Sequence, residues 1–199
     1  MAIIGLSKPY FAKYSNNGTT ITYSDGGLMG KAVEMSIEPS TTDDSNLYAD
    51  NAIAESERSF SGGSGTIKTD HLTNEVSLAI LGLKEQAIPS VEGMTDTSVK
   101  ELVFDDDMAT PYLGIGHIVK AKKGGVNVWR AIVLTKVKFS LPSDAATTQG
   151  ESIEWQTPEL SYTIMKDDSA KHMWKRQADF TNEADAESYI KNILSITGV

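Results

Sequence analysis

The chain of 199 residues contains no cysteine. This absence excludes disulfide scaffolds, thiolate metal sites and cysteine nucleophiles, and it fits a reducing cytoplasm. No apolar run approaches the roughly 20 residues that span a bilayer, and no basic segment precedes an apolar one near Met1, so we expect a soluble protein with no membrane partner. Basic residues are also scarce, since 18 lysines and arginines accompany 27 acidic residues and the net charge is −9. Because such a surface gains little from counterion release, tight binding to nucleic acid is disfavoured.

The chain does have enough apolar material for one sizeable domain. Hydrophobic residues make up 40% of it and charged residues 23%, which is typical of a globular protein. A chain of this length buries about 70% of its unfolded surface, so it needs neither a disulfide nor a metal to hold it together, and we expect no cofactor. We therefore expect a single domain over residues 1–199.

Strand patterns dominate the sequence. Asn17-Gly18 lies between two strand-like runs and predicts a tight β-hairpin turn. Val33, Met35 and Ile37 alternate with polar residues, which predicts a strand with one apolar and one acidic face that ends at Pro39. Further strands are predicted at residues 59–68, 99–104, 112–119, 126–139, 152–157 and 159–165.

Two segments have helical periodicity. Thr69 or Asp70 is the expected N-cap of the first helix, which ends at Gly82. Thr181 or Asn182 is the expected N-cap of the second helix, which covers about residues 182–196. Many strands and two helices, without a βαβ rhythm, predict a mainly β fold, an antiparallel β-sandwich or barrel-like domain with one flanking helix and a C-terminal helix.

Residues from about 39 to 58 form a polar stretch without a clean period, which predicts a long extended loop. Ordered loops of this length are uncommon, and they are usually functional or disordered. The apolar residues Leu47, Tyr48 and Ile53 argue against simple disorder. We expect the loop to be an arm that becomes buried only in an assembly.

A search for catalytic or metal-binding motifs finds none that is complete. Residues 62–66 approach the hydrolase pattern Gly-x-Ser-x-Gly but end in threonine. The acidic residues 105–107 lack the later ligands and the glycine of a calcium loop. His71, His117 and His172 are scattered without metal-ligand spacing. We therefore expect neither an enzyme nor a metal site.

Several segments together resemble the major tail protein, or tail tube protein, of long-tailed bacteriophages. One is Leu47-Tyr48-Ala49-Asp50-Asn51 with Glu55 after it, and another is Asp70-His71-Leu72-Thr73-Asn74-Glu75-Val76 leading to Leu81-Gly82. The others are Pro111-Tyr112-Leu113-Gly114-Ile115-Gly116-His117, Lys136-Val137-Lys138-Phe139 and Ile153-Glu154-Trp155-Gln156-Thr157-Pro158-Glu159-Leu160. The resemblance covers roughly residues 30 to 165 by pattern, with an error of a few residues at each boundary.

The resemblance implies a structural virion protein that forms hexameric rings. In that family the rings stack into a tube, neighbouring sheets join into an inner barrel, and DNA leaves the capsid through the lumen. It also implies tape measure, tail terminator and distal tail proteins as partners, and synthesis in the host bacterial cytoplasm. The loop residues expected to contact adjoining subunits or rings are Leu47, Tyr48, Ala49, Asp50, Asn51 and Ile53.

Charge indicates how DNA could pass through such a tube without tight binding. An acidic lumen repels phosphates, so DNA slides without sticking. Glu34 and Glu38, on the polar face of their strand, are the candidates for the lumen lining. The lysines at 120, 122 and 123 form a small basic patch of the kind found at ordinary soluble turns.

Three other functions stay open. The first is the tube protein of a contractile injection or secretion system, which has the same fold class. The second is a surface adhesion or carbohydrate-binding β domain, which should present clustered exposed aromatic residues, whereas the tryptophans here lie in apolar patterns. The last is an enzyme whose catalytic residues come together only in the folded chain.

Overall fold

The computed structural model describes residues 2–89, 92–96, 98–143, 148 and 156–197. Over these residues the protein is mainly β with antiparallel pairing and two helices, as the sequence predicts. An eight-stranded sheet has the order β2-β1-β9-β10-β11-β6-β3, with β12 attached to β10. Its strands are β1 (Ala2–Asn16), β2 (Ile21–Leu28), β3 (Ala32–Thr41), β6 (Phe60–Thr69), β9 (Tyr112–Lys123), β10 (Val126–Phe139), β11 (Glu159–Met165) and β12 (Lys175–Phe180).

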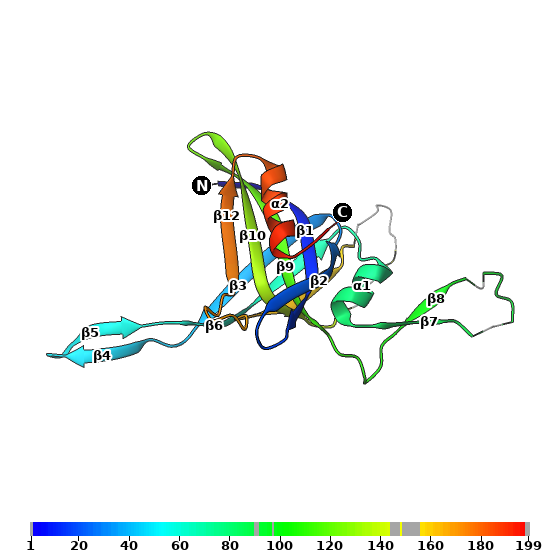
Figure 1. The fold of residues 1–199 in the computed structure, drawn as a ribbon, viewed down its shortest axis with the longest axis horizontal. Coiled ribbons are helices and arrows are strands. Elements are labelled where there is room, and N and C mark those ends of the chain that lie inside the picture. Colours follow the sequence, from blue (N-terminus) through cyan, green and yellow to red (C-terminus); the bar gives the residue numbers. More distant parts are fainter. Residues whose placement is uncertain (1, 90–91, 97, 144–147, 149–155, 198–199) are drawn as a thin grey trace.

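Strand β10 divides this sheet into two layers. Its first part, Trp129 to Leu134, pairs with β12, and its last part, Lys136 to Phe139, pairs with β11. Strands β6 and β3 continue from β11 and run obliquely to β9 and β10 (Figure 1). The main core lies between the layers, with buried side chains from β6, β9, β10 and β11. The arrangement is sandwich-like.

The two helices complete two separate cores. Helix α1 (Asn74–Leu81) packs Val76, Ile80 and Leu81 into the main core. Helix α2 (Glu183–Ile193) covers the other face of β9 and β10 and forms a second core with them. Apolar residues on both faces of β10 are therefore covered.

The helix boundaries confirm two of the four predicted ends, and α2 ends at Ile193 rather than near residue 196. Asn182 caps α2, accepting a hydrogen bond from the Asp185 backbone at 2.8 Å, and Gly82 ends α1 with a φ of 69°. The predicted start of α1 at Thr69 or Asp70 is wrong, because Thr73 is the N-cap. Asp70 instead accepts hydrogen bonds from the backbone of Lys31 and His71.

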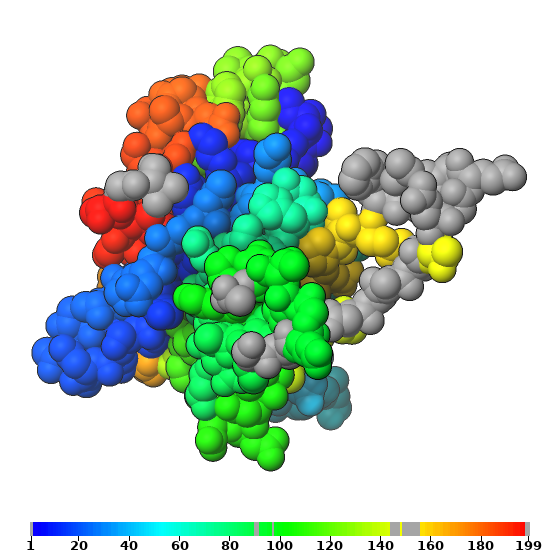
Figure 2. Space-filling model, turned by 90° about the vertical axis from the view of Figure 1, so that its right-hand side faces the viewer, coloured from blue at the N-terminus to red at the C-terminus, as the bar shows by residue number. Residues whose placement is uncertain are grey.

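Two hairpins project from the body on opposite sides (Figure 1). One consists of β4 (Ser45–Ala49) and β5 (Ala52–Glu57), inside the segment predicted as an extended loop. The other consists of β7 (Lys84–Ala87) and β8 (Lys100–Val103), and it follows α1 (Figure 2, green). The prediction of one long loop over 39–58 is therefore wrong in form, because residues 39–41 belong to β3 and most of the rest is a hairpin.

The other strand predictions have mixed outcomes. The Asn17-Gly18 hairpin and the strands at 59–68, 99–104, 112–119, 126–139 and 159–165 are confirmed within a few residues. Pro39 does not end β3, which runs on to Thr41 as an edge strand where a missing N–H is tolerated. Residues 152–155 of the strand expected before Pro158 lie outside the described residues. Strands β7 and β12 were not predicted.

The buried His117 should make the stability of the folded protein sensitive to mild acid. Burial, aided by the positive charge of Lys175, lowers the pKa of His117 to about 4. The unfolded chain takes up a proton near pH 6.5, so stability that is complete above pH 6.5 is lost as the pH falls toward 4. Between pH 7 and pH 5 we expect a loss of about 2 kcal/mol in the free energy of unfolding.

Urea unfolding at pH 7 and pH 5 measures this loss. His117→Phe replaces the imidazole with an apolar ring of similar size, and it should remove most of the difference between the two pH values. His71→Gln changes an exposed histidine and should keep the wild-type difference. An equal acid loss in His117→Phe and the wild type would contradict the assignment.

Candidate assembly surfaces

The β4–β5 hairpin, which we call the arm, turns at the motif that the sequence singled out. Asp50 and Asn51 are the two central turn residues, and their φ values are 50° and 63°. Two positive φ values are the signature of the type I′ turn that matches the twist of a hairpin, and Asp and Asn tolerate them better than most residues. The requirements of the turn therefore explain why Asp50 and Asn51 follow Ala49 in this motif.

The arm presents apolar side chains to solvent. Tyr48 lies opposite Ile53 in the register, so the two side chains project from one face. Leu47 lies opposite Glu55 and belongs to the other face. The exposed fractions of Leu47, Tyr48 and Ile53 are 61%, 66% and 55%. Large apolar side chains that cluster on a surface usually mark an interaction site.

The base of the arm is held by polar contacts. The Arg58 guanidinium binds both carboxylate oxygens of Asp44, at 2.5 and 2.6 Å. The Thr42 N–H donates to the Ser59 carbonyl at 2.8 Å, which continues the ladder between β3 and β6 toward the arm. These contacts fix how the arm leaves the body, while its tip has only the partner strand.

The two candidate lumen residues share one face of β3. Glu34 and Glu38 lie on the outward side together with Ser36, whose Oγ is 3.0 Å from Oγ1 of Thr66. Lys68 on β6 pairs with Glu34 at 3.0 Å and with Glu159 at 3.1 Å, so it offsets part of the negative charge of this face. Glu34 and Glu38 are both exposed, and Glu38 is the one nearer the arm along β3.

Several strand edges are open among the described residues. Strands β2, β3 and β12 each pair with one strand only. Strand β1 pairs with β2 from Tyr10 onward, so its segment from Ala2 to Ser7 has only β9 beside it. Open edges carry unpaired N–H and C=O groups that can accept a strand from another chain. The sequence did not predict the β1 and β12 edges, because they depend on long-range pairing.

The N-terminal segment and the β9–β10 turn form a second exposed apolar site. Ile3 pairs with Ala121, and Ala121 pairs with Val128. Ile3 and Val126 are 73% and 65% exposed. In this register Lys123 shares a face with Ile3 and Val126, whereas Lys120 and Lys122 lie on the other face of β9.

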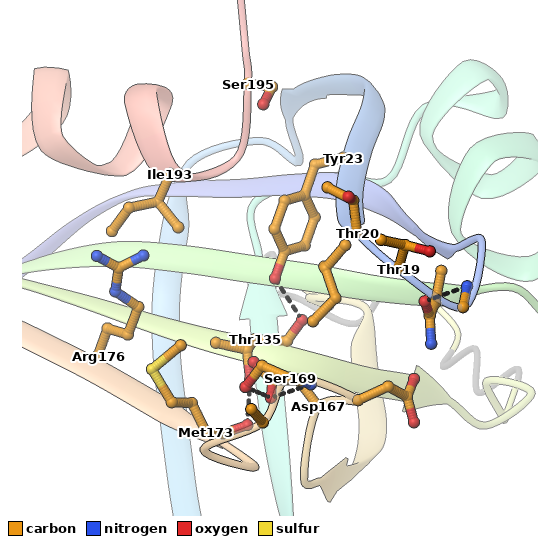
Figure 3. A pocket seen from close by; sticks show the side chains of 15 residues that line it. Thr19, Thr20, Tyr23, Thr135, Asp167, Ser169, Met173, Arg176, Ile193 and Ser195 are labelled. Carbon is orange, nitrogen blue, oxygen red and sulfur yellow. Dashed lines mark hydrogen bonds between the residues drawn. The ribbon is translucent and has the colours of Figure 1, made fainter.

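A cavity of about 630 Å³ lies between the β1–β2 turn, the 167–173 turn and the end of α2 (Figure 3). The Tyr23 hydroxyl donates to the Thr135 carbonyl at 2.8 Å across its floor. The Asp167 carboxylate accepts hydrogen bonds from the hydroxyl and the backbone N–H of Ser169, at 2.5 and 3.1 Å. These polar groups bond to one another and hold the turn.

The remaining searches concern metals, membranes and relatives. Within the described ranges, no group of three or more His, Asp or Glu side chains is placed to hold a metal ion. In the same part of the chain, no helix is long and apolar enough to cross a membrane. Trp129 and Trp174 are half-buried, and Trp174 stacks on Phe60 with ring centroids 4.4 Å apart. No family model and no curated protein matches the chain.

Proposed function

We propose that this chain is a structural subunit that polymerises into a hollow phage tail tube of stacked hexameric rings. The observation that carries the proposal is the arm, a hairpin whose apolar side chains stay more than half exposed in the described part of the chain. A hairpin of this size is marginal by itself in water, so its exposed Tyr48, Ile53 and Leu47 gain most of their stabilisation by burial against another chain.

Open sheet edges support the same function. Natural proteins usually blunt an edge with charges, bulges or covering loops, because an exposed edge recruits other strands. Strand β12 and the Ala2–Ser7 segment of β1 bound the same part of the sheet on its two sides. Joining β12 of one subunit to the β1 edge of the next would continue the sheet around a ring.

Three parts of the proposal rest on the resemblance to tail tube proteins. They are the hexameric ring, the tape measure, tail terminator and distal tail proteins as partners, and DNA as the cargo. In this proposal Glu34 and Glu38 line the lumen, where DNA passes without tight binding. The location is the tail of the virion.

A tube of a contractile injection or secretion system would use the same surfaces. The cargo distinguishes the two functions, because only the phage tube carries DNA. An adhesion domain has less support, since the exposed aromatic residues Tyr48, Phe104 and Tyr112 lie on different parts of the chain rather than on one platform.

Replacing the arm should abolish assembly and spare the fold. In the variant, Asn-Gly replaces residues 45–57 and joins Asp44 to Arg58 through a two-residue turn. Because the arm packs mainly on itself, we expect the free energy of unfolding to change by less than about 1 kcal/mol. Negative-stain microscopy of concentrated protein should find rings or hollow rods in the wild type and only monomers in the variant.

A matched set of point variants tests whether the apolar side chains are responsible. Leu47→Ser, Tyr48→Ser and Ile53→Ser together keep the hairpin length and should also prevent rods. Leu141→Ser removes a similarly exposed apolar side chain elsewhere and should leave them. Rods of normal length from the arm-replaced chain would refute the role of the arm, and a wild type that never assembles would refute the proposal.

Reversing charge in the lumen should slow DNA release. We expect Glu38→Lys to leave assembly intact and to lower the rate of DNA ejection from particles, because lysine attracts passing phosphates. Glu34 is better tested as Glu34→Gln, since a lysine there would lie beside Lys68. Glu101→Lys, an equal charge reversal on β8, is the control. Unchanged ejection in Glu38→Lys particles would remove Glu38 from the lumen.

A further inference from the structure

The cavity beside the β1–β2 turn has the size of a small-molecule site. Its volume of about 630 Å³ lies within the usual range for such sites, about 300–1,000 Å³. Strand β2 contributes Ile21 and Tyr23, the turn before β12 contributes Met173, and the end of α2 contributes Ile193. These side chains give the cavity an apolar wall with one aromatic ring (Figure 3).

Asp167 places a carboxylate on the wall of this cavity. The residue is only 3% exposed, and its Oδ1 accepts both hydrogen bonds from Ser169. Within the described ranges, no hydrogen bond reaches Oδ2 and no cationic side chain pairs with this carboxylate. Because a nearly buried carboxylate has lost much of its hydration, a cation supplied by a ligand would stabilise it.

The neighbouring carboxylate of Asp168, by contrast, already has its cation. Its Oδ2 lies 2.7 Å from Nζ of Lys136 and accepts a hydrogen bond from the Tyr14 hydroxyl at 2.7 Å. Asp167 is therefore the available acidic group of this turn. A single available carboxylate suits an organic ammonium better than calcium, which needs roughly six to eight oxygen ligands.

Arg176 on β12 brings the opposite charge to the same cavity. In the part of the chain that the structure describes, its guanidinium has no ion pair and lies 5.9 Å from the centroid of the Tyr189 ring. Figure 3 shows this guanidinium well apart from Asp167, and no ion pair joins the two. Since a guanidinium matches the geometry of a carboxylate, Arg176 is available to bind the acidic group of a ligand.

The walls of the cavity are held in place by hydrogen bonds. The Asp167 N–H and the Thr135 hydroxyl both donate to the Met173 carbonyl, at 2.7 and 2.8 Å. Burial raises the pKa of the Tyr23 hydroxyl, Asp167 adds to this rise and Arg176 opposes it, so both charges lie near that hydroxyl. A site that is ordered before binding loses less entropy when a ligand enters.

We propose that this cavity binds a small zwitterion, an α-amino acid with an apolar side chain. The ammonium group binds Oδ2 of Asp167, the carboxylate binds the Arg176 guanidinium, and the side chain lies against Tyr23 and Met173. A simple amine would leave Arg176 without a partner, and a simple carboxylic acid would bring a second negative charge to Asp167. The inference goes beyond the proposed function and does not rest on it, because neither the arm nor the candidate lumen residues line the cavity.

An NMR titration of the full chain tests the site with L-leucine, L-methionine and L-phenylalanine. At least one of them should give saturable shifts of the backbone amides of Tyr23, Ser169 and Arg176. The amino acid that binds most tightly is then compared with its amide, which lacks the carboxylate, and with its deaminated acid, which lacks the ammonium group. Each analogue should bind at least tenfold more weakly, because each leaves one charge of the cavity unpaired.

Two variants test the assigned residues. Asp167→Asn keeps the side-chain shape and the acceptor for Ser169, and Arg176→Gln removes the guanidinium. Each should weaken binding at least tenfold, and the amino acid should raise the midpoint of thermal unfolding of the wild type but not of the variants. Asp107→Asn and Lys171→Gln change exposed charges outside the cavity lining, so they should bind like the wild type.

Three outcomes would overturn the proposal. They are undiminished binding to either cavity variant, equal affinity for an analogue with only one charge, and no saturable binding by any of the three amino acids. Arg176 is exposed, so Arg176→Gln decides the matter even if Asp167→Asn does not fold. None of these outcomes depends on rings or rods, so a failure here would leave the proposed function in place.

Discussion

The architecture depends on one constraint, that both edges of β10 must be hydrogen-bonded along the strand. One edge pairs with β9 along most of its length, with a register shift between Leu134 and Val137, while the other edge pairs from Trp129 onward and changes partner from β12 to β11 between Leu134 and Lys136. A buried backbone group without a partner is costly, so the change of partner must leave few gaps. Because β12 and β11 diverge from this point, the sheet splits into two layers that enclose the main core.

The layer formed by β11, β6 and β3 closes only if β6 leaves space for the Tyr162 ring of β11. Tyr162 lies across Gly65, and its hydroxyl donates to the Ser36 carbonyl at 2.7 Å. A Cβ atom at position 65 would be 2.5 Å from the Tyr162 ring, so glycine is needed there. The core is therefore closed within the subunit, and among the described residues the exposed apolar side chains of the arm and the open strand edges lie outside it.

Local signals in the sequence predicted the parts that are local in the structure. Asn17-Gly18 correctly predicted its hairpin because the conformational preferences of turn residues act over a few residues. The start of α1 was misplaced because Asp70 bonds to Lys31, a contact 39 residues away along the chain. The pairing of Ile3 with Ala121 was not predicted for the same reason, because the two residues lie far apart along the chain. For the arm, the sequence predicted a loop where the structure has a hairpin, and the predicted contact role of its residues stays a prediction.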